Sequence, residues 1–326
     1  MIERSDHEQN LWPETLLSAW GVSGQQTPAD PAEVARRLRL PGGVAEHLTA
    51  VYSPLTERLA RRLPGRSGPM VLGINGAQGT GKSTAAEVLA HLLGVRGFRV
   101  CCLSIDDLYL TAAARQRLAT EVHPLLRTRG VPGTHDVALG VTLIDQLKSA
   151  TPETRTPIPR FDKASDDRRP QPEWDLWVGR PHLIVFEGWC VGARPQPEAS
   201  LSEPVNDLER QEDAEGHWRR YANACLADYE ELFAPLDHLL MLKAPSFDQV
   251  YEWRAQQEQA LEASLAESGR AGTRVMSSSE LQRFIQHYER LTRWILAEMP
   301  ERADLVFELN PAHRVQRIVA PRGTPL

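Results

Sequence analysis

One eight-residue run constrains this 326-residue chain more than any other feature. Residues 76–83 read GAQGTGKS and fit the pattern G-x-x-x-x-G-K-[ST]. The apolar residues 70–74 before the run predict a short buried strand, and residues 83–90 after it predict the start of a helix. A strand, a glycine-rich turn and a helix in this order point backbone N–H groups at one anion. The run therefore predicts a phosphate-binding loop within an α/β fold that has a parallel sheet.

Two side chains of this loop have specific predicted roles. Lys82 would reach the terminal phosphates of a nucleotide, and the Ser83 hydroxyl would complete the oxygen shell of a magnesium ion. The alternative is a glycine-rich turn that only caps a helix, but the complete pattern in its strand-to-helix setting favours nucleotide binding. The predicted nucleotide-binding residues are Gly76, Ala77, Gln78, Gly79, Thr80, Gly81, Lys82, Ser83 and Thr84.

Composition narrows the class of partner. With 25% charged residues, 41% hydrophobic residues and a net charge of −6, the chain has no general signature of a protein that binds nucleic acid or an anionic membrane. Residues 1–10 are polar and acidic rather than basic and apolar, and no apolar run approaches the ~20 residues of a membrane span. The four cysteines have no zinc-site spacing, so we expect reduced thiols. We predict a cytoplasmic protein with a small-molecule substrate.

Acidic residues follow two further predicted strands. Asp106 and Asp107 come after the strand at 98–103, and Glu187 ends the strand at 183–186. Ligands of parallel α/β sheets bind outside the carboxyl ends of the strands, so these acids are candidates for proton transfer and metal binding. The alternative is helix capping, which suits Asp107 as well as chemistry does. It suits Glu187 poorly, because Glu is not a favoured cap.

Two irregular segments lie between those strands. In residues 129–136, Asp136 is predicted to cap the following helix, which leaves Thr134 and His135 free to face a ligand. Residues 157–170 form a charged, proline-bounded segment that is either a solvated connection or part of a site.

The other segments are predicted from periodicity and composition. We expect N-terminal helices at 30–40 and 44–63, the second interrupted by Pro54, and a mobile acidic segment at 205–215. One amphipathic helix is expected at 218–233 and strands at 238–242 and 303–309, whereas no strand is predicted in the tail from residue 310.

Several motifs in one order resemble the D-glycerate 3-kinase family of plants, yeasts and bacteria. They are the phosphate loop, SIDDLY at 104–109, RGVPGTHD at 129–136, PRFDK at 159–163 and FEGW at 186–189. The similarity continues through YEWR at 251–254 and Gly272, Met276 and Ser277, and covers nearly everything after residue 65. Single pieces are also similar to uridine, pantothenate and phosphoribulose kinases. Residues 164–169 depart from the family, being shorter and more acidic than the glycine-containing stretch of its eukaryotic members.

The resemblance implies a fold and a division of the chain. Residues 66–326 would form one P-loop kinase domain, a three-layer sandwich around a five-stranded parallel sheet, with substrate loops at 127–170 and a lid region at 245–276. Residues 1–65 would form an N-terminal helical extension. ATP and Mg²⁺ are the implied cofactors. Asp106 matches the acid that accepts the substrate hydroxyl proton, and Glu187 matches the acid that holds magnesium or its waters.

The resulting hypothesis is transfer of the γ-phosphoryl group of ATP to a hydroxyl of D-glycerate. The predicted catalytic residues are Asp106, Lys82, Glu187 and the lid residue Arg254, and Ser83 and Glu187 are the predicted metal ligands. The predicted substrate residues are Asp106, Tyr109, Thr134, His135, Arg160 and Lys163, among which Arg160, Lys163 and His135 would bind a carboxylate. Asn310 and His313 are expected near the base.

Three other functions are open to a chain of this kind. A kinase of the same architecture could act on a nucleoside, on a pantothenate-like compound or on a sugar. A nucleotide-dependent switch or metal chaperone would carry N-K-x-D or a cysteine-rich site, and the sequence has neither. An inactive scaffold would have lost Lys82, Asp106 or Glu187, and all three are present.

Overall fold

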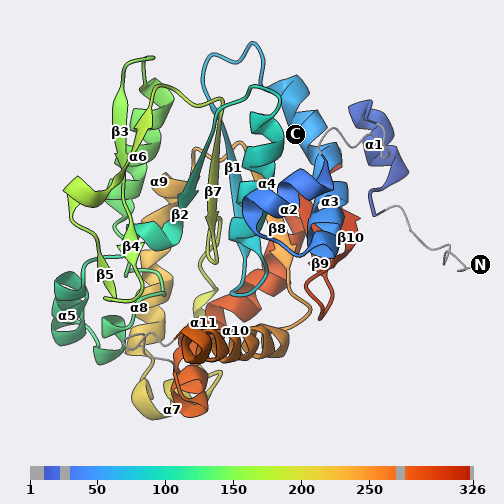
Figure 1. Ribbon diagram of the computed structural model, residues 1–326. Helices are drawn as coiled ribbons and strands as arrows, with labels where there is room; N and C mark the ends of the chain where they lie inside the picture. The colour runs from blue at the N-terminus through green and yellow to red at the C-terminus, as the bar shows by residue number, and fades with distance from the viewer. Residues whose placement is uncertain (1–10, 23–29, 269–275, 324–326) are drawn as a thin grey trace, which may run out of the picture.

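A six-stranded sheet runs through the middle of the protein, as Figure 1 shows for the computed structural model, which describes residues 11–22, 30–268 and 276–323. The strand order is β10-β9-β8-β1-β7-β2. All neighbouring pairs are parallel except β9 and β10. The bounds are β1 (Met70–Gly76), β2 (Val100–Ser104), β7 (Leu183–Gly188), β8 (His238–Lys243), β9 (Leu305–Leu309) and β10 (Val315–Val319).

The α/β fold class is confirmed, and the prediction of five strands needs one correction. The tail after residue 310 turns back at His313, which has a left-handed φ of 59°, and adds β10 antiparallel to β9. Only Val315 and Ile318 of this strand are buried. Because β10 is short and lies at the sheet edge, its sequence lacks the continuous apolar run by which the parallel strands were predicted.

Helices cover both faces of the sheet. In β1, Met70, Leu72 and Ile74 pack in one apolar cluster with α3 (Gly42–Arg62) and α4 (Lys82–Gly94). Val71 points to the opposite face, because successive side chains of a strand alternate. There it shares a second cluster with three helices, α6 (Val137–Ser149), α9 (Tyr229–Phe233) and α11 (Ser278–Glu298). Burial on both faces explains why β1 reads as continuously apolar.

The N-terminal helices share the first of these clusters. The Trp12 ring, just before α1 (Glu14–Trp20), lies 5.6 Å from the ring of Phe307 in β9, and its indole N–H donates to the Val51 carbonyl at 3.0 Å. The helix α2 (Pro31–Leu38) packs against α3. Apolar packing thus crosses residue 65, and the division of the chain there stays a prediction.

Two helices differ from their predicted bounds. The helix α3 continues through Pro54. Because proline has no backbone N–H, the Ala50 carbonyl lacks its helical hydrogen bond. Ala50 is exposed, so water can supply a replacement donor. The helix predicted at 218–233 is broken into α8 (His217–Cys225) and α9. Between them, backbone N–H groups bond three residues back, as from Leu226 to Asn223, and this tightens the chain into turns.

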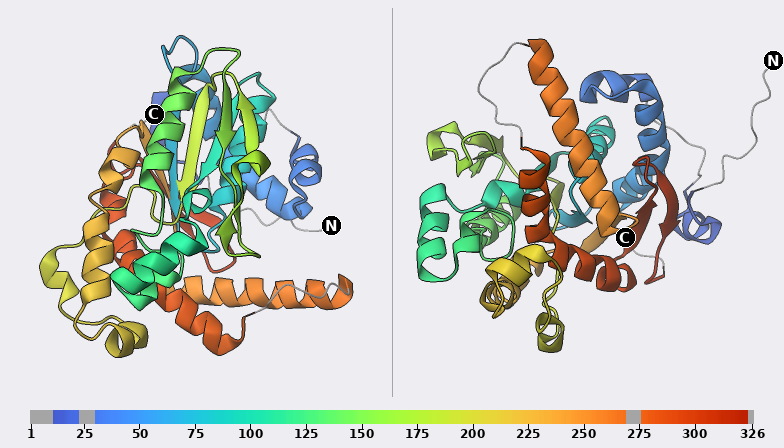
Figure 2. Two further views of the ribbon diagram at one scale, coloured as in Figure 1. Left: turned by 90° about the vertical axis from the view of Figure 1, so that its left-hand side faces the viewer. Right: turned by 90° about the horizontal axis from the view of Figure 1, so that it is seen from below.

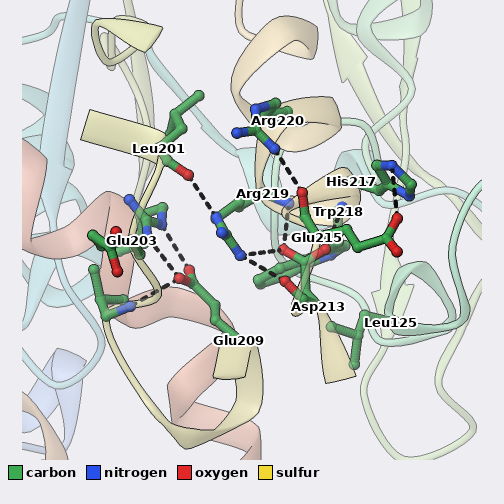
Figure 3. A network of polar contacts seen from close by, with 12 residues as sticks. Leu125, Leu201, Glu203, Glu209, Asp213, Glu215, His217, Trp218, Arg219 and Arg220 are labelled. Carbon is green, nitrogen blue, oxygen red and sulfur yellow. Dashed lines mark hydrogen bonds and ion pairs between the residues drawn. The ribbon is translucent and has the colours of Figure 1, made fainter. Parts of the chain in front are cut away.

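The acidic segment at 205–215 is ordered, and the prediction of a mobile stretch is wrong. It contains α7 (Asp207–Glu212), and its acids Glu209 and Asp213 are buried (Figure 3). Glu209 pairs with Arg290 of α11 at 2.6 Å, and Asp213 pairs with Arg219 of α8 at 3.1 Å. Composition shows that the segment is acidic, but it does not show which acids have buried partners.

The charged segment at 157–170 is also ordered. It forms part of two antiparallel pairs, β3 (Arg155–Ile158) with β6 (Asp175–Val178), and β4 (Phe161–Asp162) with β5 (Asp167–Arg168).

The remaining elements are α5 (Ala112–Glu121), η1 (Ile105–Leu108), η2 (Pro124–Arg127), η3 (Gln171–Glu173), η4 (Glu198–Leu201) and η5 (Met299–Glu301).

One helix lies across the carboxyl-terminal edge of the sheet. Figure 2 shows α10 (Phe247–Ser268) running beneath the strands, with α11 beside it. The predicted lid region at 245–276 includes α10, but its residues 269–275 lie outside the described residues. Among the helices that the structure describes, none is both long and apolar enough to cross a membrane.

Candidate active site

The phosphate loop has the closed geometry that its glycines predict. Gly79 and Gly81 both have a φ of +82°, a conformation that residues with a side chain adopt rarely. A Cβ atom at Gly79 would lie 2.8 Å from Cβ of Trp253 in α10, so a side chain there would collide with the helix. The Thr80 hydroxyl donates to the Ala77 carbonyl at 2.8 Å and closes the loop on itself. Lys82 and Ser83 then open α4.

A cavity of about 420 Å³ lies beside this loop. Several predicted site residues line it, from the loop and from three other segments: Gln78, Gly79, Gly81, Lys82, Ser83, Thr84, Asp106, Tyr109, Lys163 and Arg254. Donor and acceptor residues predicted from separate motifs therefore share one cavity. Chemistry between a bound nucleotide and a second small molecule is geometrically feasible here.

Glu187 stands behind Ser83. The Ser83 hydroxyl donates to Glu187 Oε1 at 2.7 Å, because β7 is the neighbour of β1 in the sheet and brings its last residues beside the loop. Glu187 is buried, and its Oε2 has no hydrogen-bond partner within the described part of the chain. A buried carboxylate oxygen normally has a partner. The pair thus fits a hard cation or the water bound to it.

The described residues contain no group of three or more His, Cys, Asp or Glu side chains that could hold a metal ion. A site with so few protein ligands suits magnesium, which keeps several waters and binds substrate phosphates.

Asp106 lines the cavity from η1, directly after β2, and β2 is the neighbour of β7 in the sheet. Its carboxylate pairs with Lys163 Nζ at 2.8 Å and accepts the Tyr109 hydroxyl at 3.0 Å. Burial by itself raises the pKa of this carboxyl, but the charges of Lys163 and Lys82 outweigh burial and lower the pKa of Asp106 to about 2. The group is therefore an anion at any ordinary pH, able to accept a hydrogen bond from a hydroxyl.

Arg160 and Asp107 form a structural pair outside the cavity. Arg160 bonds Asp107 at 2.7 Å and Asp175 at 2.8 Å, while Asp107 also accepts the backbone N–H of Phe161 at 2.9 Å. With its Nε and Nη1 both engaged, Arg160 holds the start of β4 against η1. The structure does not bring Arg160 to the cavity wall with Lys163.

Thr134 and His135 are likewise buried beneath the cavity rather than on its wall. The Thr134 hydroxyl donates to the Val131 carbonyl at 2.7 Å and so stabilises its own loop. The His135 ring stacks on Tyr109, with 4.5 Å between ring centres, and its Nδ1 lies 2.7 Å from the Tyr229 hydroxyl. Burial lowers the pKa of His135 to about 4, so the ring is neutral. It supports the tyrosine that touches Asp106.

Five cavity residues were not predicted as site residues: Arg129, Trp189, Gln257, Phe284 and Tyr288. Arg129 opens the motif at 129–136, and this motif is a sequence signal by which it could have been found. Phe284 and Tyr288 belong to the apolar stripe of α11, and such a stripe predicts packing in the core rather than contact with a ligand.

His313, in the turn after the last parallel strand, lies against the phosphate loop. The His313 ring stacks on Trp253, with 4.4 Å between centres, and its Nδ1 lies 2.9 Å from the Gly79 carbonyl. Arg254, one residue further along α10, pairs with Glu258. The β9–β10 turn and α10 thus both pack against the phosphate loop. The role of Asn310 and His313 near a base stays a prediction.

Comparison with known proteins identifies kinases as relatives of this chain. No family model matches the chain. The uncharacterised kinase mug58 of Schizosaccharomyces pombe is 35% identical over 227 residues, which span 68% of this chain and 78% of that protein. The chloroplastic D-glycerate 3-kinase of Arabidopsis thaliana is 31% identical over 234 residues, which span 68% of this chain but 46% of the plant protein.

A solved structure shows the same fold. The D-glycerate 3-kinase from Cryptococcus neoformans superposes with a TM-score of 0.66 over 84% of this chain and 98% of that chain, at 22% identity. The resemblance drawn from the motifs is confirmed. The chain is an ATP-dependent small-molecule kinase, and it belongs to the family of P-loop kinases that includes the D-glycerate 3-kinases.

Proposed function

We propose that this kinase transfers the γ-phosphoryl group of ATP to a hydroxyl of D-glycerate. The observation that carries the proposal is the ionised Asp106 carboxylate, which lines the same cavity as Lys82 of the phosphate loop. The choice of acceptor is supported by the relatives, because the plant protein and the fungal structure are both D-glycerate 3-kinases by name.

The donor side is formed by the loop and by Glu187. Lys82 would contact the terminal phosphates, and the backbone N–H groups of residues 76–84 would surround them. Ser83 and Glu187 would hold magnesium through the hydroxyl and the unpartnered Oε2. When bound, magnesium neutralises the charge of the β- and γ-phosphates. Arg254 of α10 would add a cation beside the transferred group.

On the acceptor side, Asp106 would orient the hydroxyl and receive its proton. The hydroxyl oxygen forms a bond to the γ-phosphorus, the bond from that phosphorus to the β–γ bridging oxygen breaks, and ADP leaves. Phosphoryl transfer relies on positioning and charge more than on a strong base, which suits a carboxylate of low pKa. Tyr109 and Lys163 would contact the substrate. Thr134, His135 and Arg160 would keep the substrate loops in place.

The test is a coupled ADP-release assay with purified full-length protein and a panel of acceptors. D-glycerate should give the fastest turnover, and phosphorus NMR should identify a phosphoglycerate product. A strong response to uridine or pantothenate with none to D-glycerate would replace the proposed acceptor and leave the kinase assignment intact.

A further inference from the structure

Four cationic side chains line the cavity, and they divide by position. Lys82 belongs to the phosphate loop, and Arg254 lies on α10 next to Trp253, which packs on that loop. Arg129 and Lys163 come instead from the segments that follow β2, on the side of Asp106. For a small acceptor whose hydroxyl rests on Asp106, Arg129 and Lys163 are therefore the candidate partners of its other end.

The backbone at Arg129 is tightly held. The Tyr288 hydroxyl donates to the Arg129 carbonyl at 3.0 Å. The next residue, Gly130, has a φ of +136°, and a Cβ atom there would lie 2.4 Å from the Tyr288 hydroxyl oxygen. Only glycine fits between this backbone and the tyrosine. The start of the arginine side chain is thereby fixed relative to the cavity.

The guanidinium of Arg129 is also oriented. It lies over the Phe161 ring, with Cζ 5.5 Å from the ring centre, and its Nη1 pairs with Asp166. Asp166 is itself held by Arg115 at 3.0 Å, and Arg115 is almost completely buried. Since a guanidinium has five N–H donors, the bond to Asp166 leaves others for a ligand. A guanidinium that is held in one orientation and has unused N–H donors is suited to binding a carboxylate.

The charges of this group do not cancel. Asp166 is shared by Arg115 and Arg129, so the three side chains together carry one net positive charge. Lys163 and Asp106 neutralise each other nearby. Arg129 also lines a second cavity of about 510 Å³, with Lys163 and Phe284 in the wall common to both. The net positive charge of these three side chains is accordingly accessible to a small anion through Arg129.

We propose that Arg129 binds the carboxylate of the acceptor and restricts this kinase to hydroxy acids. The inference rests on the proposed function and deepens it, since it assigns the acceptor's acidic group to one side chain. It also replaces the sequence-based candidates Arg160, which is engaged by two carboxylates, and His135, which is buried and neutral.

The experiment compares matched acceptors that differ by one carboxylate: D-glycerate with glycerol, and pantothenate with its neutral alcohol pantothenol. ADP release is measured for the wild type, Arg129→Met, Arg129→Lys and the control Arg169→Met. Arg169 is an exposed arginine directly after β5, and it lines neither cavity. Binding of a fluorescent ATP analogue is measured for all four proteins.

Arg129→Met should raise the KM of the acidic acceptor by about 10- to 100-fold, as expected for loss of a charge-assisted bidentate contact. The KM of the neutral analogue and the affinity for the ATP analogue should stay within about twofold. Arg129→Lys should keep a preference for the acid but have a higher KM for it, because an ammonium group lacks the planar pair of N–H donors that binds a carboxylate bidentately. Arg169→Met should match the wild type.

The outcomes separate the inference from the proposed function. If the wild type phosphorylates D-glycerate and Arg129→Met keeps the same KM for it, the inference is overturned and the proposed function is not. The same holds if Arg129→Met loses activity equally with glycerate and with glycerol. Turnover of pantothenate instead of glycerate, with the predicted effect of Arg129→Met, would overturn the proposed acceptor and support the inference. Turnover of a neutral acceptor such as uridine in place of the acids, or no turnover with any compound, would overturn both the inference and the proposed function.

Discussion

The ammonium nitrogen of Lys163 lies 2.8 Å from Oδ2 of Asp106, although the two residues are 57 positions apart in the chain. The lysine side chain is 63% exposed, so this contact can open without disturbing the core. While it is closed, Lys163 helps to hold the pKa of Asp106 at about 2. Any ligand that draws the lysine away raises that pKa and makes the carboxylate a better proton acceptor.

Replacing Asp106 by Asn should nearly abolish turnover while leaving nucleotide binding intact. The amide keeps the size of the side chain but cannot accept the hydroxyl proton, so kcat should fall by about 10²- to 10⁴-fold. The affinity for an ATP analogue, measured by fluorescence titration, should not weaken. Asp145→Asn, at an exposed position of α6, is the control. Turnover within a few-fold of wild type in the Asp106 variant would exclude its role as proton acceptor.

Replacing Lys163 by Met should change the pH profile. Removal of the cation leaves burial of Asp106 in place, and burial raises a carboxyl pKa, so the pKa of Asp106 should rise from about 2. Because the carboxylate must be ionised to act, the acid limb of kcat/KM should move to higher pH. From about pH 4 upward the wild-type profile should be flat, because its limb lies near pH 2, while kcat/KM of the variant should fall toward acid pH. A variant profile as flat as that of the wild type would show that Lys163 does not control this group.

Replacing Glu187 by Gln should raise the magnesium requirement. The buried carboxylate bonds the Ser83 hydroxyl at 2.7 Å, and its second oxygen has no partner among the described residues. Loss of its charge should raise the magnesium concentration for half-maximal rate by about 10- to 100-fold. The measurement is a magnesium titration at fixed ATP, and a chelator should stop the wild-type reaction. An unchanged titration curve would remove Glu187 from the metal site.

The acids at the strand ends were predictable because their position follows from sheet geometry. Continuous apolar runs mark buried parallel strands, and the carboxyl ends of such strands meet at one edge. Asp106 and Glu187 could therefore be placed near Lys82 without knowledge of the packing. The cavity that contains Lys82 and Asp106 is consistent with that reasoning.

Other features depend on partners far away in the chain. Asp166 reads as part of a solvated charged run, yet it bridges Arg115 and Arg129, 51 and 37 positions away. Arg160 reads as a ligand-binding cation, yet Asp107 and Asp175 engage it. A charged side chain has the same local pattern whether its partner is a substrate or another loop, so only the tertiary structure separates the two.

The buried pair of Asp213 and Arg219 gives a stability prediction. Both side chains are almost fully buried, and the Asp213 carboxylate also accepts the backbone N–H groups of Trp218 and Arg219 at 2.8 and 3.1 Å (Figure 3). Asp213→Ala would leave a guanidinium charge buried without its carboxylate, and the free energy of unfolding should fall by about 3 to 5 kcal/mol. Urea denaturation followed by tryptophan fluorescence measures this change.

The matched control is Arg210→Ala in the neighbouring helix α7. Arg210 pairs with Asp207, and both side chains are more than half exposed. Water screens such a pair, so its loss should change the free energy of unfolding by less than about 1 kcal/mol. If both variants lost the same small amount, the polar network would contribute no more to the fold than a surface ion pair does. A large loss confined to Asp213→Ala would instead show that the acidic segment at 205–215 is part of the folded core.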